Sequence, residues 1–120
     1  MDDRSRAAAY RLVVATILAD GVIRDAEEEF LAGVRGRLGI DDAQRRELTR
    51  GLDVGVLPLE EAREIAEPED RQTLLRLCAE AASSDGEVSR TERLALQQIA
   101  TALGLDEAAL KAALRGAAPR

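Results

Sequence analysis

Apolar residues recur along this chain at intervals of three and four, the pattern of amphipathic α-helices with one face on a core. In the first such segment, from about Ser5 to Ala19, the apolar positions are Tyr10, Val13, Val14 and Ile17. Further helices are predicted over about residues 25–38, 42–50, 59–66, from Pro68 onward, 89–103 and 106–117. No segment convincingly predicts a strand. The sequence therefore predicts an all-α protein of about seven helices.

Residues typical of helix ends mark the boundaries of these segments. Gly39 and Gly104 stand where a left-handed C-terminal cap is expected. Asp41 is a suitable N-cap for the third helix, and Pro68 fits the first position of the fifth. Residues 51–67, which contain two glycines and a proline before Pro68, are expected to connect two halves of the protein.

One acidic motif occurs twice in the chain. Residues 20–27 are D-G-V-I-R-D-A-E and residues 85–92 are D-G-E-V-S-R-T-E, so both fit the pattern D-G-x-[I/V]-x-x-x-E. The register continues without a gap to L-G-I-D at 38–41 and L-G-L-D at 103–106, always 65 residues later. Agreement of this length predicts an internally duplicated helical unit.

The duplication predicts a domain organisation as well. We expect a single domain over residues 1–120, with repeat halves at about 5–50 and 68–117 and a connection at 51–67. A chain of this length buries roughly two thirds of the surface that its unfolded form exposes, so one core is sufficient.

Each copy of the motif places carboxylates on both sides of a glycine turn, and oxygen ligands from tight turns suit hard divalent cations. The spacing matches the second half of a calcium-binding EF-hand loop, but residues without suitable side chains occupy the first ligand positions of both copies. Because affinity follows the number and charge of the oxygen ligands, we expect at most a weak site, best suited to calcium or magnesium. The candidate metal ligands are Asp20, Glu27, Asp85, Glu87 and Glu92.

Helix capping is an alternative explanation of the same acids. Ser89 and Glu92 form an S-x-x-E capping box, which needs no metal. The position aligned with Ser89 is Arg24, which cannot cap, so either Asp25 caps the second helix with Glu28 as its partner or the two turns differ in detail. In this alternative the protein is purely an interaction scaffold whose acids only cap helices.

Composition excludes several function classes. The net charge is −6 and aromatic residues make up 2% of the chain, which argues against a nucleic-acid partner. The absence of histidine removes serine–histidine and cysteine–histidine nucleophiles, and we expect no enzymatic activity and no organic cofactor.

The remaining compositional evidence concerns cellular location. The single cysteine, Cys78, lies on an apolar helix face and suits a reducing compartment. No uninterrupted apolar run of about 18 residues occurs, and the N-terminus has no apolar segment typical of a signal peptide. We therefore expect a cytoplasmic protein that does not insert into membranes.

The stretch 82–92, followed by Leu96, Ile99 and 103–105, resembles the tellurite-resistance TerB-like family, which is related to the N-terminal domain of the membrane-anchored co-chaperone DjlA. Residues 18–27 resemble the family's first copy of the motif, and the similarity extends over about residues 8–114. One departure is Val22, where many members carry an acid as at Glu87, so the first turn is expected to be the weaker source of ligands.

The resemblance implies an all-helical, duplicated cytoplasmic domain whose acidic surface is suspected of binding divalent cations. It also implies a role in tellurite resistance or membrane-associated stress complexes, with a protein partner and no catalytic activity. We therefore expect association with a membrane-bound complex through that partner.

Overall fold

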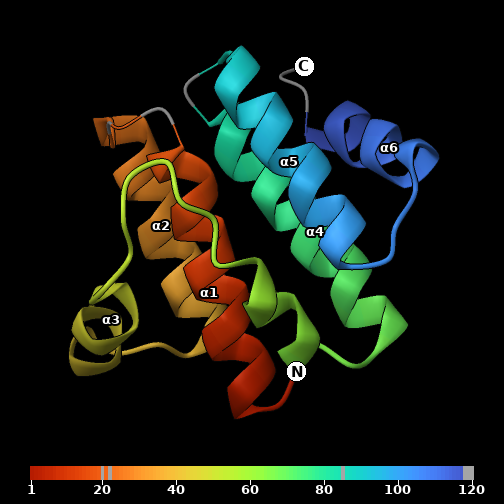
Figure 1. Cartoon of the computed structure of the whole chain (residues 1–120). Helices are drawn as coiled ribbons and strands as arrows, with labels where there is room; N and C mark the ends of the chain where they lie inside the picture. The colour runs from red at the N-terminus through yellow and green to blue at the C-terminus, as the bar shows by residue number, and fades with distance from the viewer. Residues whose placement is uncertain (20, 22, 85, 118–120) are drawn as a thin grey trace.

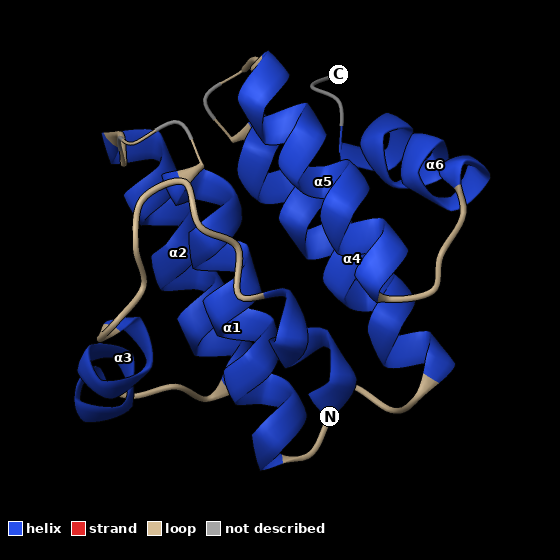
Figure 2. Ribbon diagram, viewed as in Figure 1, coloured by secondary structure: helices blue, strands red, loops and turns tan. Residues whose placement is uncertain are grey.

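The computed structural model describes residues 1–19, 21, 23–84 and 86–117, and the described chain is helical throughout, with no strand (Figures 1 and 2). It contains six α-helices and one 3-10 helix: α1 (Asp3–Leu18), α2 (Asp25–Leu38), α3 (Asp42–Thr49), η1 (Leu59–Glu64), α4 (Pro68–Ser83), α5 (Arg90–Ala102) and α6 (Glu107–Ala117). The predicted all-α class and the seven helices are confirmed.

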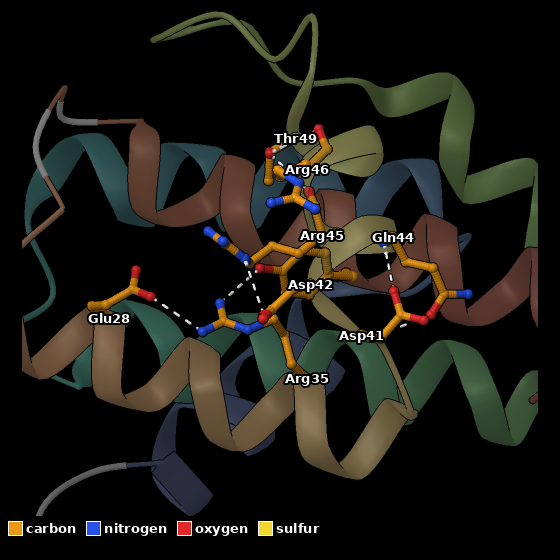
Figure 3. A network of polar contacts seen from close by, with 9 residues as sticks. Glu28, Arg35, Asp41, Asp42, Gln44, Arg45, Arg46 and Thr49 are labelled. Carbon is orange, nitrogen blue, oxygen red and sulfur yellow. Dashed lines mark hydrogen bonds and ion pairs between the residues drawn. The ribbon is translucent and has the colours of Figure 1, made fainter.

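Local capping contacts explain where these helices begin and end. Asp2 accepts a hydrogen bond from the Ser5 amide at 2.8 Å, so α1 begins slightly before the predicted Ser5. At the start of α3, Asp41 and Gln44 exchange reciprocal bonds at 2.8 and 3.0 Å (Figure 3). Gly39 ends α2 with a left-handed φ of 69°, as its position predicted.

The helices form two hairpins that pack side by side. α1 packs against α2, α4 packs against α5, and contact between α1 and α4 joins the two pairs. Helices α1 and α4 run in the same direction, so the α1–α2 turn and the α4–α5 turn lie at the same end of the bundle (Figure 1). The shorter elements pack around this frame, with α3 on α1, η1 on α1 and α5, and α6 on α4 and α5.

The core is almost entirely aliphatic, and α1 lies at its centre. Most of α1 from Ala8 to Ile17 is buried, because the other helices cover it on several sides. Tyr10 contributes a fully buried ring, and its hydroxyl accepts a hydrogen bond from Arg35 Nη1 at 3.0 Å. Arg35 also pairs with Glu28 at 3.2 Å (Figure 3).

The short helix predicted over about residues 59–66 is present as the 3-10 helix η1, which is followed by the fully buried Ile65. Its backbone bonds run between residues three apart, from the Glu61 amide to Pro58 and from the Ile65 amide to Ala62. The 3-10 geometry suits this short segment because residues three apart lie on one side of it, so that Ala62 and Ile65 both reach the core.

The helix bounds repeat at the interval found in the sequence. Helices α1, α2 and α3 begin at residues 3, 25 and 42, and α4, α5 and α6 begin at 68, 90 and 107, each 65 residues later. This correspondence supports the internal duplication, which stays a prediction, as does the proposed division into halves.

Candidate functional site: the two acidic turns

Both turns reverse the chain at a glycine with a left-handed backbone. Gly21 has φ 90° and Gly86 has φ 96°, a region in which a side chain is strained. The Gly21 amide donates to Leu18 at 3.0 Å, and the Gly86 amide donates to Ser83 at 2.9 Å. The two glycines therefore occupy equivalent positions in equivalent turns. The predicted ligands Asp20 and Asp85 lie outside the described residues.

A buried glutamate follows each turn and caps the next helix. The side chains of Glu27 and Glu92 are 0% and 1% exposed. Glu27 Oε1 accepts the Arg24 amide at 2.9 Å, and Glu92 Oε1 accepts the Ser89 amide at the same distance. Each glutamate thus satisfies a backbone donor at a helix N-terminus, where the helix dipole also favours a negative charge.

The two caps differ at the N-cap residue. Ser89 Oγ accepts the Glu92 amide at 3.1 Å, so the capping box predicted for α5 is confirmed. In the first turn the N-cap is Arg24, whose guanidinium lies 3.7 Å from Glu27 Oε1 and has no acceptor for an amide. The expectation that Asp25 caps α2 is wrong, because Asp25 is already the first helical residue; the turns differ in detail instead.

Sequence reasoning did not predict the burial of these two glutamates. Both stand in the first turn of a helix, where exposed acids are common, and the adjacent Glu28 and Glu29 are indeed exposed. The available signal was the repeat, because it retains Glu27 and Glu92 and neither of the following two acids. A carboxylate is retained in a buried position only with hydrogen-bond partners, which the N-cap amides supply.

The structure gives the predicted ligands different environments. Glu87 is exposed, whereas Glu27 and Glu92 are buried in their capping positions. Across the described ranges, no group of three acidic or cysteine side chains is arranged to hold a metal ion. A site built on these turns therefore needs Asp20 or Asp85 in addition to the glutamates, and the ligand set stays a prediction.

The surroundings of the two turns also differ. The connection after α3 passes over the end of α1 (Figure 1), and Val54 Cγ1 lies 3.5 Å from the position that a Cβ at Gly21 would take. Around Gly86 no other described atom lies within 4 Å of that position. The second turn is thus the more open of the two, a difference that the repeated motif gave no reason to expect.

Cys78 does not belong to either turn. It is fully buried on α4, and burial raises the pKa of its thiol to about 12, with a smaller opposing effect from a hydrogen bond to Thr16. A thiol in this state is not an effective nucleophile at neutral pH.

The fold and the turns define a class of small helical module with two glycine turns, each followed by a buried capping glutamate. The family described as tellurite resistance protein TerB matches residues 59–115, from η1 into α6. This segment is therefore similar to the TerB family, and the resemblance is confirmed over it.

The match covers slightly less than half of the chain and includes the second acidic turn. The first copy of the motif lies outside it, although the resemblance was expected from about residue 8. No curated protein and no solved structure matches this chain. Among the described helices, none has both the length and the apolar character needed to cross a membrane.

Proposed function

We propose that this protein is a non-enzymatic TerB-type module that acts in the cytoplasm, within a tellurite-resistance or membrane-stress assembly, and binds a divalent cation weakly at its acidic turns. The family match to residues 59–115 supports the role in tellurite resistance, because the matching family is described by that role. The matched segment also contains the second acidic turn. The protein partner of the assembly links the module to a membrane-bound complex.

The observation that carries the cation proposal is the matched geometry of the turns. Both place a left-handed glycine before a buried glutamate, at the same end of the bundle. Capping accounts for Oε1 of Glu27 and Glu92, but it does not account for the repeated aspartates at positions 20 and 85. Carboxylate oxygens on a tight turn are the ligands that calcium and magnesium prefer.

Isothermal titration with calcium, magnesium, manganese and zinc tests this proposal, with the double variant Asp85→Asn and Glu92→Gln. Glutamine keeps the oxygen that accepts the Ser89 amide, so the variant removes charge and retains the cap. We expect the heat of calcium or magnesium binding to fall in this variant, because only the first and weaker turn keeps its acids. The control is Glu69→Gln with Asp70→Asn, which removes the same charge at the other end of α4. Absence of any heat at millimolar metal would refute the cation proposal.

The second candidate is a pure interaction scaffold, which the hydrogen bonds to the N-cap amides favour. In that case Glu92→Ala lowers stability by about 0.5–2 kcal/mol through loss of a cap, while the Asp85→Asn and Glu92→Gln variant keeps its partner. A pull-down with wild type and this variant separates the candidates. Retention of the partner with no metal binding selects the scaffold.

A further inference from the structure

A basic groove lies between the first turn of α5 and the last turns of α6. It has a volume of about 370 Å³ and is lined by Arg93, Lys111, Leu114 and Arg115. Within the described part of the chain, none of its three cations forms an ion pair, although the protein carries a net charge of −6. Leu94, the residue after Arg93, is 49% exposed. The groove therefore combines unpaired positive charge with accessible apolar surface.

An acidic surface of opposite character lies around the start of α2. Asp25, Glu28 and Glu29 are exposed there, next to the exposed Ile23. Two cations also lie nearby, but each is paired: Arg24 with the buried Glu27 and Arg35 with Glu28. Val54, which approaches Gly21, is 60% exposed. We call residues 23, 25, 28, 29 and 54 the acidic turn surface.

Three exposed large apolar side chains lie near the acidic turn surface, and one lies on α5 next to Arg93. The described residues contain five of them, and apart from Met1 they belong either to α5 beside the basic groove or to the α1–α2 turn and the connection near it. Grouped apolar side chains on a surface are typical of interaction sites. Here the group at the α1–α2 turn has acidic neighbours, and the single Leu94 has basic ones.

Both surfaces lie at the same end of the bundle, because α2 and α5 begin there and α6 ends there (Figure 1). A two-fold rotation can therefore place the acidic turn surface of each copy on the basic groove of the other. In such an isologous pairing every contact occurs twice and the assembly closes at two subunits. We propose that this protein forms a two-fold symmetric dimer through these two surfaces.

The net charge does not prevent this pairing at moderate salt. The molecule is at least 26 Å across, so the net charges of two copies lie several screening lengths apart when the Debye length is about 8 Å. Carboxylates and guanidinium groups in contact are separated by about 4 Å and are screened far less. Local attraction therefore outweighs the long-range repulsion at physiological ionic strength.

Charge reversal and charge exchange test the dimer. The groove variant is Arg93→Glu with Lys111→Glu, and the turn variant is Asp25→Lys with Glu29→Lys; all four side chains are exposed. Each variant alone brings like charges together in both contacts of a homodimer, so each is expected to be monomeric. An equimolar mixture brings opposite charges together in both contacts and is expected to form heterodimers.

The measurement is sedimentation velocity at up to about 0.5 mM protein, in EDTA so that the result is independent of the proposed cation site. We expect wild type to dimerise with concentration and to bind about tenfold or more weakly when salt rises from about 0.15 to 0.5 M. The control Arg46→Glu with Arg63→Glu makes the same charge change on exposed residues of α3 and η1 and is expected to dimerise like wild type.

Several results would overturn the proposal: a monomeric wild type at all concentrations, a dimer that survives both reversals, or folded reversed variants that do not pair when mixed. Circular dichroism establishes that each variant is folded. Lysines at the start of α2 oppose the helix dipole, so the neutral pairs Asp25→Asn with Glu29→Gln and Arg93→Gln with Lys111→Gln provide a second series. If the variants with neutral substitutions dimerise as strongly as wild type, the proposal is also contradicted.

Discussion

The difference between the two N-caps gives the sharpest prediction for this fold. Arg24 and Ser89 stand at equivalent positions and have nearly the same extended backbone, with φ −89° and ψ 165° for the first and φ −68° and ψ 162° for the second. Ser89 accepts the Glu92 amide, and Arg24 has no side-chain oxygen to accept the equivalent Glu27 amide. We predict that Arg24→Ser completes the capping box of α2 and stabilises the protein.

The magnitude follows from two opposing contributions. A serine N-cap stabilises a helix by about 1 kcal/mol relative to a residue without a capping side chain. The variant loses the charge contacts of Arg24, of which the ion pair with Glu27, at 3.7 Å and with Arg24 half exposed, is worth about 0.3–0.5 kcal/mol. The net gain is at most about 0.5 kcal/mol, which raises Tm by up to about 2 °C in a chain of this size.

Chemical denaturation followed by circular dichroism at 222 nm measures this difference, with Arg24→Ala as the matched control. Alanine removes the same ion pair without supplying an acceptor, so this control is expected to be slightly less stable than wild type. The reciprocal variant Ser89→Arg is expected to lose about 0.5–1 kcal/mol. If Arg24→Ser is no more stable than Arg24→Ala, the capping argument is wrong.

Three further predictions concern the core, the thiol and the first N-cap. Leu96→Ala removes a fully buried side chain and is expected to cost about 2–5 kcal/mol in urea denaturation; a cost below 1 kcal/mol would contradict its place in the core. Because burial raises the pKa of Cys78 to about 12, Ellman's reagent at pH 8 is expected to react only after denaturant is added, and rapid reaction of the native protein would oppose this. The Ser5 hydrogen bond lowers the pKa of Asp2 from 3.8, so its stabilisation is complete above pH 3.8 and is lost as pH falls through the lowered value. Melting from pH 5 to 2 is expected to show a shallower dependence in Asp2→Asn, and an unchanged dependence would contradict the linkage.

Most of the helices could be predicted from the sequence because their signals are local. Asp41 bonds to a residue three positions later, and Gly39 ends its helix through its own backbone angle. Such contacts form within one helical turn, whatever the rest of the chain does. A short helix at η1 was also predicted, but its 3-10 geometry was not, since the helix type depends on how Ala62 and Ile65 reach a core built by distant residues.

The candidate site was only partly predictable for the same reason. The repeat identified Glu27 and Glu92, together with Asp20 and Asp85, as candidate ligands, and the capping box at Ser89 was predicted in full. The burial of these two glutamates could not be predicted, because it depends on which side of each helix the rest of the protein covers. The approach of Val54 to Gly21 could not be predicted either, because it depends on the path of a connection whose sequence has no periodic pattern.

The sequence by itself determined the helical class, the helix ends and the pairing of acids with glycine turns, because each depends on residues within about four positions of one another. Tertiary structure alone decided that both turns lie at one end of the bundle. It also decided that Arg93 shares a groove with residues 111–115. These features depend on the packing of α5 and α6 against α4, and the buried area of the whole core, rather than any local bond, selects that arrangement.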